Sequence, residues 1–335
     1  MSDYLWDKRG EADAEIERLE QTLGGFAQAT PPPPLDLSKR PPARRGFSTG
    51  ALLIAASLAL AVGGAVFMLI ERRSPAWQVT TAAGRGTLSV GEWLDTHDGE
   101  ATVAVADIGS LTVEPGARLR LLSTRAGHHR MELARGTMHA TIWAPPNQFF
   151  VETPSTLAVD LGCAYTLTVD EDGGGLVTVQ VGWVGFTAGD RESFIPAGFA
   201  AVTRPGVGPG TPYSERAGNT YRQSLALIDL AEWSADAQHA LTMVLLQSQE
   251  RDEVTLWHLL QRVPAFERDR VFNRLAVFVP PPTGVTLDGI RAGDRRMLDA
   301  WWDALGLGTT SLWRTWSQQW KDSQNNLPRF ARPRR

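Results

Sequence analysis

The sequence contains a single cysteine, Cys163, in 335 residues. One thiol excludes an internal disulfide, and it also excludes a His-x-x-x-Cys-x-x-Cys zinc arrangement. No Ser-His-Asp order, phosphate-binding glycine loop or supported pair of carboxylates is present either. We therefore expect a protein that is not an enzyme, that needs no metal or cofactor, and whose fold is held by packing alone.

The chain also lacks a large excess of charge of either sign. Its 33 Lys and Arg residues nearly balance 37 Asp and Glu residues, which leaves a formal charge of −4. Without a basic field, no nucleic-acid partner is expected. The arginine-rich end, from Arg329 to Arg335, is either a solvated terminus or a contact for an anionic surface.

One stretch, residues 50–70 (GALLIAASLALAVGGAVFMLI), has no charged side chain and no polar face. At ~1.5 Å per residue it would make a rod of roughly 31 Å, close to the hydrocarbon thickness of a bilayer. It begins too deep in the chain for a signal peptide. We predict a multidomain membrane protein with a single transmembrane helix, residues 47–70, that contacts the lipid bilayer.

Basic residues lie mainly before this stretch. Four of them lie between Lys39 and Arg45 with no acid among them, whereas Glu71 partly offsets Arg72 and Arg73. The positive-inside rule then predicts a cytoplasmic N-terminus and C-terminal domains in the periplasm, at a bacterial inner membrane. A periplasmic domain without disulfides is compatible with the single cysteine.

Residues 1–30 are predicted to contain a short cytoplasmic helix. Four apolar residues, Ile16, Leu19, Leu23 and Phe26, recur at near-helical spacing, with glutamates between them. A helix this short is marginal alone, so its apolar stripe stays disordered, lies on the membrane or docks on a cytoplasmic partner. Residues 31–46, a proline-rich basic linker, are expected to form a stiff spacer before the membrane.

Residues 84–205 alternate between short apolar-polar segments and glycine-containing turns. ATVAV at 101–105 and RLRLL at 118–122 are examples, and no helix of useful length fits among them. This pattern predicts an all-β domain, either a roll, a sandwich or a solenoid. We expect residues 84–205 to be soluble and rich in sheet when expressed alone.

The order of short motifs in this segment resembles the FecR domain family of bacterial periplasmic signalling proteins. The matching positions are Gly91, Thr96, residues 107–112, 118–122, Gly136, FVET at 150–153, residues 162–167, residues 179–184, and Ala197-Gly198. The family usually has Thr and Phe where this chain has Cys163 and Tyr165. The resemblance implies a protein that senses or relays an envelope signal, with a cytoplasmic sigma factor as partner.

A second function stays open beside this one. The chain is alternatively an envelope structural or protein-binding module, anchored by one helix and with a protein partner in the envelope. The first function needs a specific cytoplasmic partner for Ile16, Leu19 and Leu23, whereas the second does not.

The C-terminal part changes to helical periodicity after a Gly/Pro linker at 206–222. Residues 223–325 are predicted to form a small all-α domain, and similar helical tails follow FecR domains in some membrane proteins. In the helix expected over 252–262, capped by Asp252, residues Val254, Trp257, Leu259 and Leu260 face inward. The expected helices cover 225–233, 235–247, 252–262, 265–278, 292–305 and 310–321.

Tryptophans gather near the end of the chain. Trp313, Trp316 and Trp320 share one helical face, and Trp301 and Trp302 precede them. A packed core is the favoured interpretation, and a surface for a partner or a membrane interface is the alternative.

The remaining polar groups are interpreted structurally. His128-His129 is expected in a solvated hairpin turn, because adjacent strand residues point to opposite faces. A turn is also favoured over a cation site at residues 95–98. Residues 170–175 (DEDGGG) lack the spacing of a calcium loop and are expected to form a flexible hairpin loop. Cys163, without a His or Asp partner in the sequence, is expected to be buried in a strand and inert.

Overall fold

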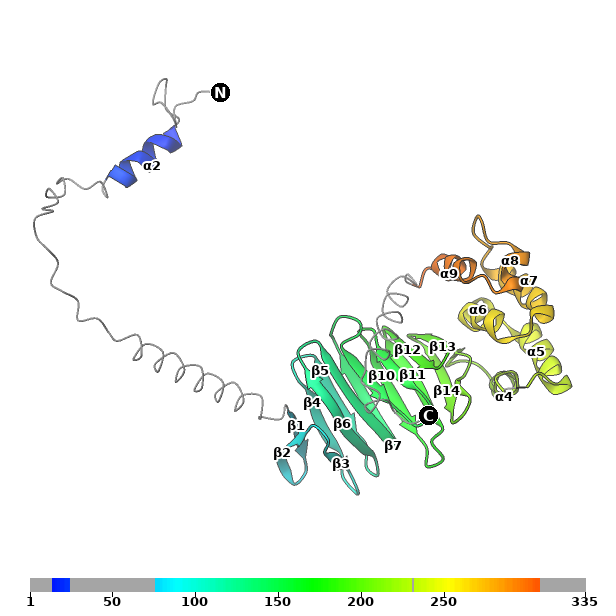
Figure 1. Ribbon diagram of the computed structural model, residues 1–335, viewed down its shortest axis with the longest axis horizontal. Helices are drawn as coiled ribbons and strands as arrows, with labels where there is room; N and C mark the ends of the chain where they lie inside the picture. Colours follow the sequence, from blue (N-terminus) through cyan, green and yellow to red (C-terminus); the bar gives the residue numbers. More distant parts are fainter. Residues whose placement is uncertain (1–13, 25–75, 231, 308–335) are drawn as a thin grey trace, which may run out of the picture. The chain divides into compact units, whose positions relative to one another are not determined.

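The computed structural model describes residues 14–24, 76–230 and 232–307 (Figure 1). They belong to two units, of which residues 1–70 contribute helix α2 (Ala14–Gly24) and residues 71–335 contribute everything else. The predicted span at 47–70, the linker at 31–46 and the predicted helix at 310–321 lie outside the described residues. Within the described ranges, no helix is both long and apolar enough to cross a membrane.

Strands fill residues 76–214 and form two sheets that face each other. The first sheet runs β2-β1-β4-β5-β7-β10-β11-β14, with β15 and β16 both beside β14. The second runs β3-β6-β7-β8-β9-β12-β13. Neighbouring strands are antiparallel except β7 and β8, which are parallel. The sheets enclose one apolar core, so the arrangement is a β sandwich.

The strands extend beyond the predicted domain 84–205, because β1 precedes it and β15 and β16 follow it. Strands β2, β3, β13 and β14 lie within it but were not expected from the sequence. The strands are β1 (Ala76–Thr81), β2 (Gly84–Ser89), β3 (Trp93–Asp95), β4 (Ala101–Val105), β5 (Gly109–Val113), β6 (Arg118–Arg125), β7 (His128–Ile142), β8 (Phe149–Glu152), β9 (Leu157–Asp160), β10 (Ala164–Val169), β11 (Gly175–Val181), β12 (Trp183–Ala188), β13 (Arg191–Pro196), β14 (Phe199–Arg204), β15 (Gly208–Pro209) and β16 (Tyr213–Ser214).

Strand β7 belongs to both sheets. Its first part pairs with β6 and β8, and its second part pairs with β5 and β10. Met131 and Leu133 are buried in the first part, and Met138 and Ala140 are buried in the second. The buried positions change from odd to even because the strand turns from one sheet to the other at Gly136. Both parts therefore face the same core.

The chain after the sandwich forms short helices (yellow to orange in Figure 1). They are α4 (Asn219–Ile228), α5 (Ala235–Gln247), α6 (Glu253–Arg262), α7 (Arg268–Phe278), α8 (Leu287–Ala292) and α9 (Arg295–Ala304). A large sheet region followed by a small helical region is what the sequence predicts. The helix expected over 292–305 is α9, which begins at Arg295 because Asp294 caps it. The preceding helix α8 was not expected, and Gly293 ends it in the left-handed conformation.

Helix α6 lies at the centre of the helical region. All residues from Val254 to Leu260 are buried, which includes the four that the sequence placed inward. Asp252 precedes this helix but does not cap it by a side-chain hydrogen bond. Its carboxylate instead accepts a hydrogen bond from the amide of Gln249, in a short turn ahead of α6.

The segment between strands and helices is packed, unlike the linker that its composition predicts. Every residue from Gly208 to Ser214 is buried. Phe150 and Phe194 from the strands share a second apolar core with Trp257 and Trp302 from the helices. A fragment ending at residue 205 would expose this core to water. Residues 71–335 form one compact unit, and the solubility of residues 84–205 expressed alone stays a prediction.

Gly136 gives a direct test of the turn in β7. Its φ is +89°, and a Cβ there would lie 2.3 Å from the Cα of Ala117. In the fragment 71–335, Gly136→Ala should lower the free energy of unfolding by about 3 kcal/mol or more, because backbone strain adds to a steric clash. Urea denaturation measures this loss.

Gly127 is the matched control for this variant. Its φ is +70°, but no atom lies within 4 Å of the position of an added Cβ. Gly127→Ala should therefore show the backbone strain alone, about 1–2 kcal/mol. Equal losses in the two variants would contradict a close packing of β7 against Ala117.

Candidate functional site

The edge of the second sheet at β13 is covered by side chains of α6. The amide of Phe194 donates a hydrogen bond to Nε2 of His258 at 3.0 Å. Nη2 of Arg262 donates to the carbonyl oxygen of Glu192 at 3.0 Å. An unpaired strand edge presents such amides and carbonyls to any extended chain. These two side chains satisfy them in the way that a neighbouring strand would.

The protonation of His258 is fixed by its surroundings. Its Nδ1 lies 2.7 Å from the carbonyl oxygen of Val254, which can only accept, so Nδ1 carries the proton and Nε2 is free to accept. Burial, together with the charge of Arg262, lowers the pKa of His258 to about 3. The imidazole is therefore neutral at physiological pH.

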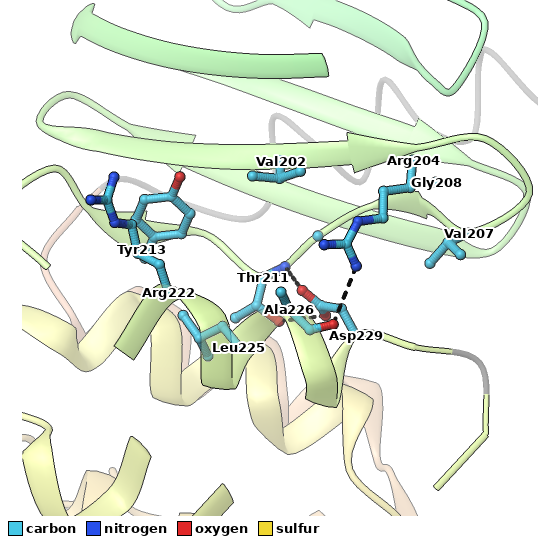
Figure 2. A pocket seen from close by; sticks show the side chains of 11 residues that line it. Val202, Arg204, Val207, Gly208, Thr211, Tyr213, Arg222, Leu225, Ala226 and Asp229 are labelled. Carbon is cyan, nitrogen blue, oxygen red and sulfur yellow. Dashed lines mark hydrogen bonds between the residues drawn. The ribbon is translucent and has the colours of Figure 1, made fainter. Parts of the chain in front are cut away.

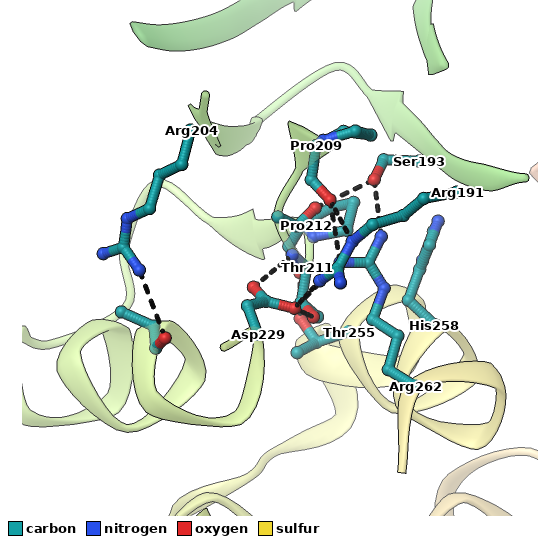
Figure 3. Close-up of polar contacts among 12 residues, drawn as sticks. Arg191, Ser193, Arg204, Pro209, Thr211, Pro212, Asp229, Thr255, His258 and Arg262 are labelled. Carbon is teal, nitrogen blue, oxygen red and sulfur yellow. Dashed lines mark hydrogen bonds and ion pairs between the residues drawn. The ribbon is translucent and has the colours of Figure 1, made fainter. Parts of the chain in front are cut away.

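Asp229, at the end of α4, joins the strands, the buried segment and α6 (Figure 3). Its carboxylate accepts hydrogen bonds from Arg262 at 2.9 Å and from Arg191 at 2.6 Å. The amide and hydroxyl of Thr211 donate to it at 2.6 and 2.8 Å. Arg262 also donates to the hydroxyl of Ser193 at 2.6 Å. A buried ion pair needs such additional hydrogen bonds to offset desolvation.

A small cavity lies beside this cluster, between β14 and α4 (Figure 2). Its volume is about 30 Å³, and its lining includes Arg204, Tyr213 and Leu225 as well as Asp229. A space of this size holds a water molecule but not a larger ligand. The Asp229 cluster joins parts of the fold, and this cavity beside it has no room for a ligand larger than water.

A second buried polar pair joins Asp160, the last residue of β9, to Cys163 in the loop after it. The Cys163 thiol donates to one carboxylate oxygen of Asp160 at 2.7 Å, and the amide of Gly162 donates to the other at 2.6 Å. Burial raises the pKa of Asp160 to about 7 and also raises the pKa of the thiol, as does the adjacent carboxylate. Cys163 is buried as predicted, but it lies before β10 and does have an aspartate partner.

His129 corrects the prediction of a solvated turn at His128-His129. It is buried in β7, and its Nδ1 lies 2.7 Å from the hydroxyl of Thr124. The indole nitrogen of Trp77 donates to the same hydroxyl at 3.0 Å. Because the turn itself is at Ala126 and Gly127, the histidines already belong to the strand. Strand β1, which carries Trp77, was not predicted, and so its contact with His129 was missed.

The other polar candidates stay structural. Asp95 pairs with Arg118 at 3.7 Å, and no group of three metal-ligating side chains occurs among the described residues. The loop 170–175 is anchored rather than free, because its glycines 173–175 are buried and the Ser155 hydroxyl donates to the carbonyl of Gly173. Trp301 and Trp302 are core residues, whereas Trp313, Trp316 and Trp320 lie outside the described residues.

The predicted docking residues fall partly within α2. Leu19 and Leu23 lie one helical turn apart, and their side chains are 61% and 64% exposed. Ile16 belongs to the same helix, and Phe26 lies outside the described residues. The structure thus places an exposed pair of leucines on the predicted stripe. Docking on a partner stays a prediction.

No family model and no curated protein matches the sequence. Two solved structures of a candidate anti-sigma factor from Parabacteroides distasonis ATCC 8503 are similar to part of the chain. The 1.65 Å structure has 14% identity and a TM-score of 0.33, and the match covers 41% of this chain and 65% of that chain. The 2.50 Å structure has 14% identity and a TM-score of 0.32, with coverages of 41% and 64%. The chain thus spans slightly less than two thirds of these structures, and a likeness this slight assigns it no function.

The pKa of Asp160 predicts how stability depends on pH. Its pKa rises from an ordinary 3.8 to about 7 on folding, so between these values the folded state keeps a proton that the unfolded state has lost. Raising the pH from about 4 to 8 should therefore destabilise the fragment 71–335 at this site by up to about 4 kcal/mol. Urea denaturation across this pH range measures the slope.

Asp160→Asn should remove this contribution, because the amide does not titrate. Asp190→Asn, which changes an exposed turn residue, is the control and should keep the slope of the unmodified protein. The same slope in all three proteins would show that Asp160 is ionised in the folded state at neutral pH.

Proposed function

We propose that this chain is a single-pass protein of a bacterial inner membrane that relays an envelope signal to a cytoplasmic sigma factor. The apolar stretch at residues 50–70 supports the membrane anchor. The excess of basic residues before it supports a cytoplasmic N-terminus and a periplasmic folded unit. The order of FecR-like motifs between Gly91 and Gly198 supports the signalling role.

The sigma factor is proposed to bind the apolar stripe of α2. The observation that carries this proposal is the exposure of Leu19 and Leu23, at 61% and 64%, on a helix of only 11 residues. An isolated helix of this length is marginal in water, and burial of each leucine on a partner would contribute about 1.5–3 kcal/mol. Binding would therefore stabilise the helix and the complex together. The proposal gives the chain a binding role and no catalytic step.

The second candidate function is an anchored envelope module that holds another protein without sigma-factor regulation. Exposed apolar side chains in the helical region favour it: Leu246, Phe266 and Val277 are 74%, 70% and 68% exposed. Large apolar side chains on a surface often mark a protein interface. This function would leave α2 without a specific partner.

The two functions are separated by changing α2 alone. Leu19→Ser together with Leu23→Ser should weaken capture of a cytoplasmic sigma factor from the same bacterium by a factor of about 10² or more, because roughly 3–6 kcal/mol of apolar burial is lost. A pull-down with the full chain, solubilised in detergent, measures the retained fraction.

The control is Glu17→Ser together with Gln21→Ser. These exposed positions are also one helical turn apart and lie on the other side of α2, so this variant should bind as the unmodified chain does. Undiminished capture by the leucine variant would exclude α2 from the interaction and favour the envelope module.

A further inference from the structure

Exposed apolar side chains gather at one end of the sandwich. Trp143 is 71% exposed just after β7, Val181 is 61% exposed at the end of β11, and Val90 is 38% exposed after β2. Pro145 and Ala197, in neighbouring loops, are exposed as well. Single exposed apolar residues are ordinary. Here a tryptophan and two valines are spread across one end of the first sheet, from β2 to β11.

The strand registers show that these residues share that end. Thr141 pairs with Ala164, and Ala164 pairs with Val181, so Trp143 and Val181 lie at the same end of the strands of the first sheet. The amide of Trp143 donates to the carbonyl of Ile108 at 3.0 Å, which ties this end to the turn after β4.

The chain enters the sandwich at the same end. Strand β1 begins at Ala76, and Ala76 pairs with Ser89, the residue before Val90. Gln78 pairs with Ala104, so the start of β1 lies beside the turn that Trp143 contacts. The opposite end of the first sheet holds the acidic loop 170–175, because β10 runs away from Trp143 and ends at Val169.

The length of chain before Ala76 indicates what this end faces. Five residues, 71–75, separate Ala76 from the apolar stretch that ends at residue 70. Such a segment reaches about 20 Å at most when fully extended. A sandwich attached this closely to a bilayer meets the headgroups first with the end where its chain begins, and Trp is enriched at that depth in membrane proteins.

We propose that this end of the sandwich rests on the lipid surface, with Trp143 inserted at the membrane interface and Val181 and Val90 beside it. This inference rests on the membrane anchoring in the proposed function and adds an orientation to it.

The test uses the full chain in vesicles of phosphatidylethanolamine and phosphatidylglycerol that contain a lipid spin-labelled at its headgroup. A fluorophore is attached at Val181→Cys or, in a second protein, at Glu171→Cys in the loop at the opposite end. Cys163 is buried and stays unlabelled under native conditions. The label at residue 181 should lose most of its fluorescence to the spin label, and the label at residue 171 should keep it.

Trp143→Ser in the Val181→Cys protein should restore most of that fluorescence, because the variant removes the side chain that is proposed to insert at the membrane interface. Leu176→Ser, another exposed apolar residue of β11 but nearer the acidic loop, should not. If the chain floats with the vesicles but the labels at residues 181 and 171 are quenched alike, the proposed orientation is wrong, although the transmembrane anchor of the proposed function stands. The same conclusion follows if Trp143→Ser does not change the quenching. If the chain does not float with the vesicles, the membrane anchor itself fails and the inference fails with it.

Discussion

The second sheet ends at β13, and hydrogen bonds from side chains of α6 cover the outer edge of that strand. Strand β13 is the last strand of the second sheet, and the amides and carbonyls on the outer edge of such a strand would otherwise pair with another strand. His258 and Arg262 satisfy these groups at 3.0 Å each, and Asp229 holds Arg262 in place. The helices also cover Phe150 and Phe194 on the outer face of that sheet. The strands and helices of residues 76–305 therefore form one packed structure.

Much of the sheet could be predicted because period-two alternation is a local property of a strand. Strand β4 (Ala101–Val105) has the predicted bounds, and its alternate residues are buried. Local periodicity could not show that residues 130–133 and 137–143 belong to one strand, since its buried positions change parity at Gly136. It also missed β15 and β16, where Gly208-Pro209-Gly210 reads as a linker but is buried against α4 and β13. Tertiary contacts decide both cases.

For the candidate sites too, local spacing indicated some groups, whereas others depend on residues that are distant in the chain. Spacing alone indicated a stripe on α2, and Leu19 and Leu23 are exposed there. The buried polar groups had no comparable signal, because their partners are distant in the chain: Arg262 lies 33 residues from Asp229, and His129 meets a tryptophan in an unpredicted strand. Asp160 was the exception, since it precedes Cys163 by three residues and its proximity could have been noticed. The proposed orientation at the membrane likewise joins a local observation, Trp143, to the register of six strands.

Hydrogen exchange at the amide of Phe194 tests most directly whether α6 completes the second sheet. Global unfolding sets the slowest exchange, and only amides held by the whole structure reach that limit. In the fragment 71–335, the Phe194 amide should exchange as slowly as that of Met138 in β7, because both open only when strands and helices unfold together. Much faster exchange at Phe194 than at Met138 would show that the helices detach separately, and that β13 is in practice a free edge.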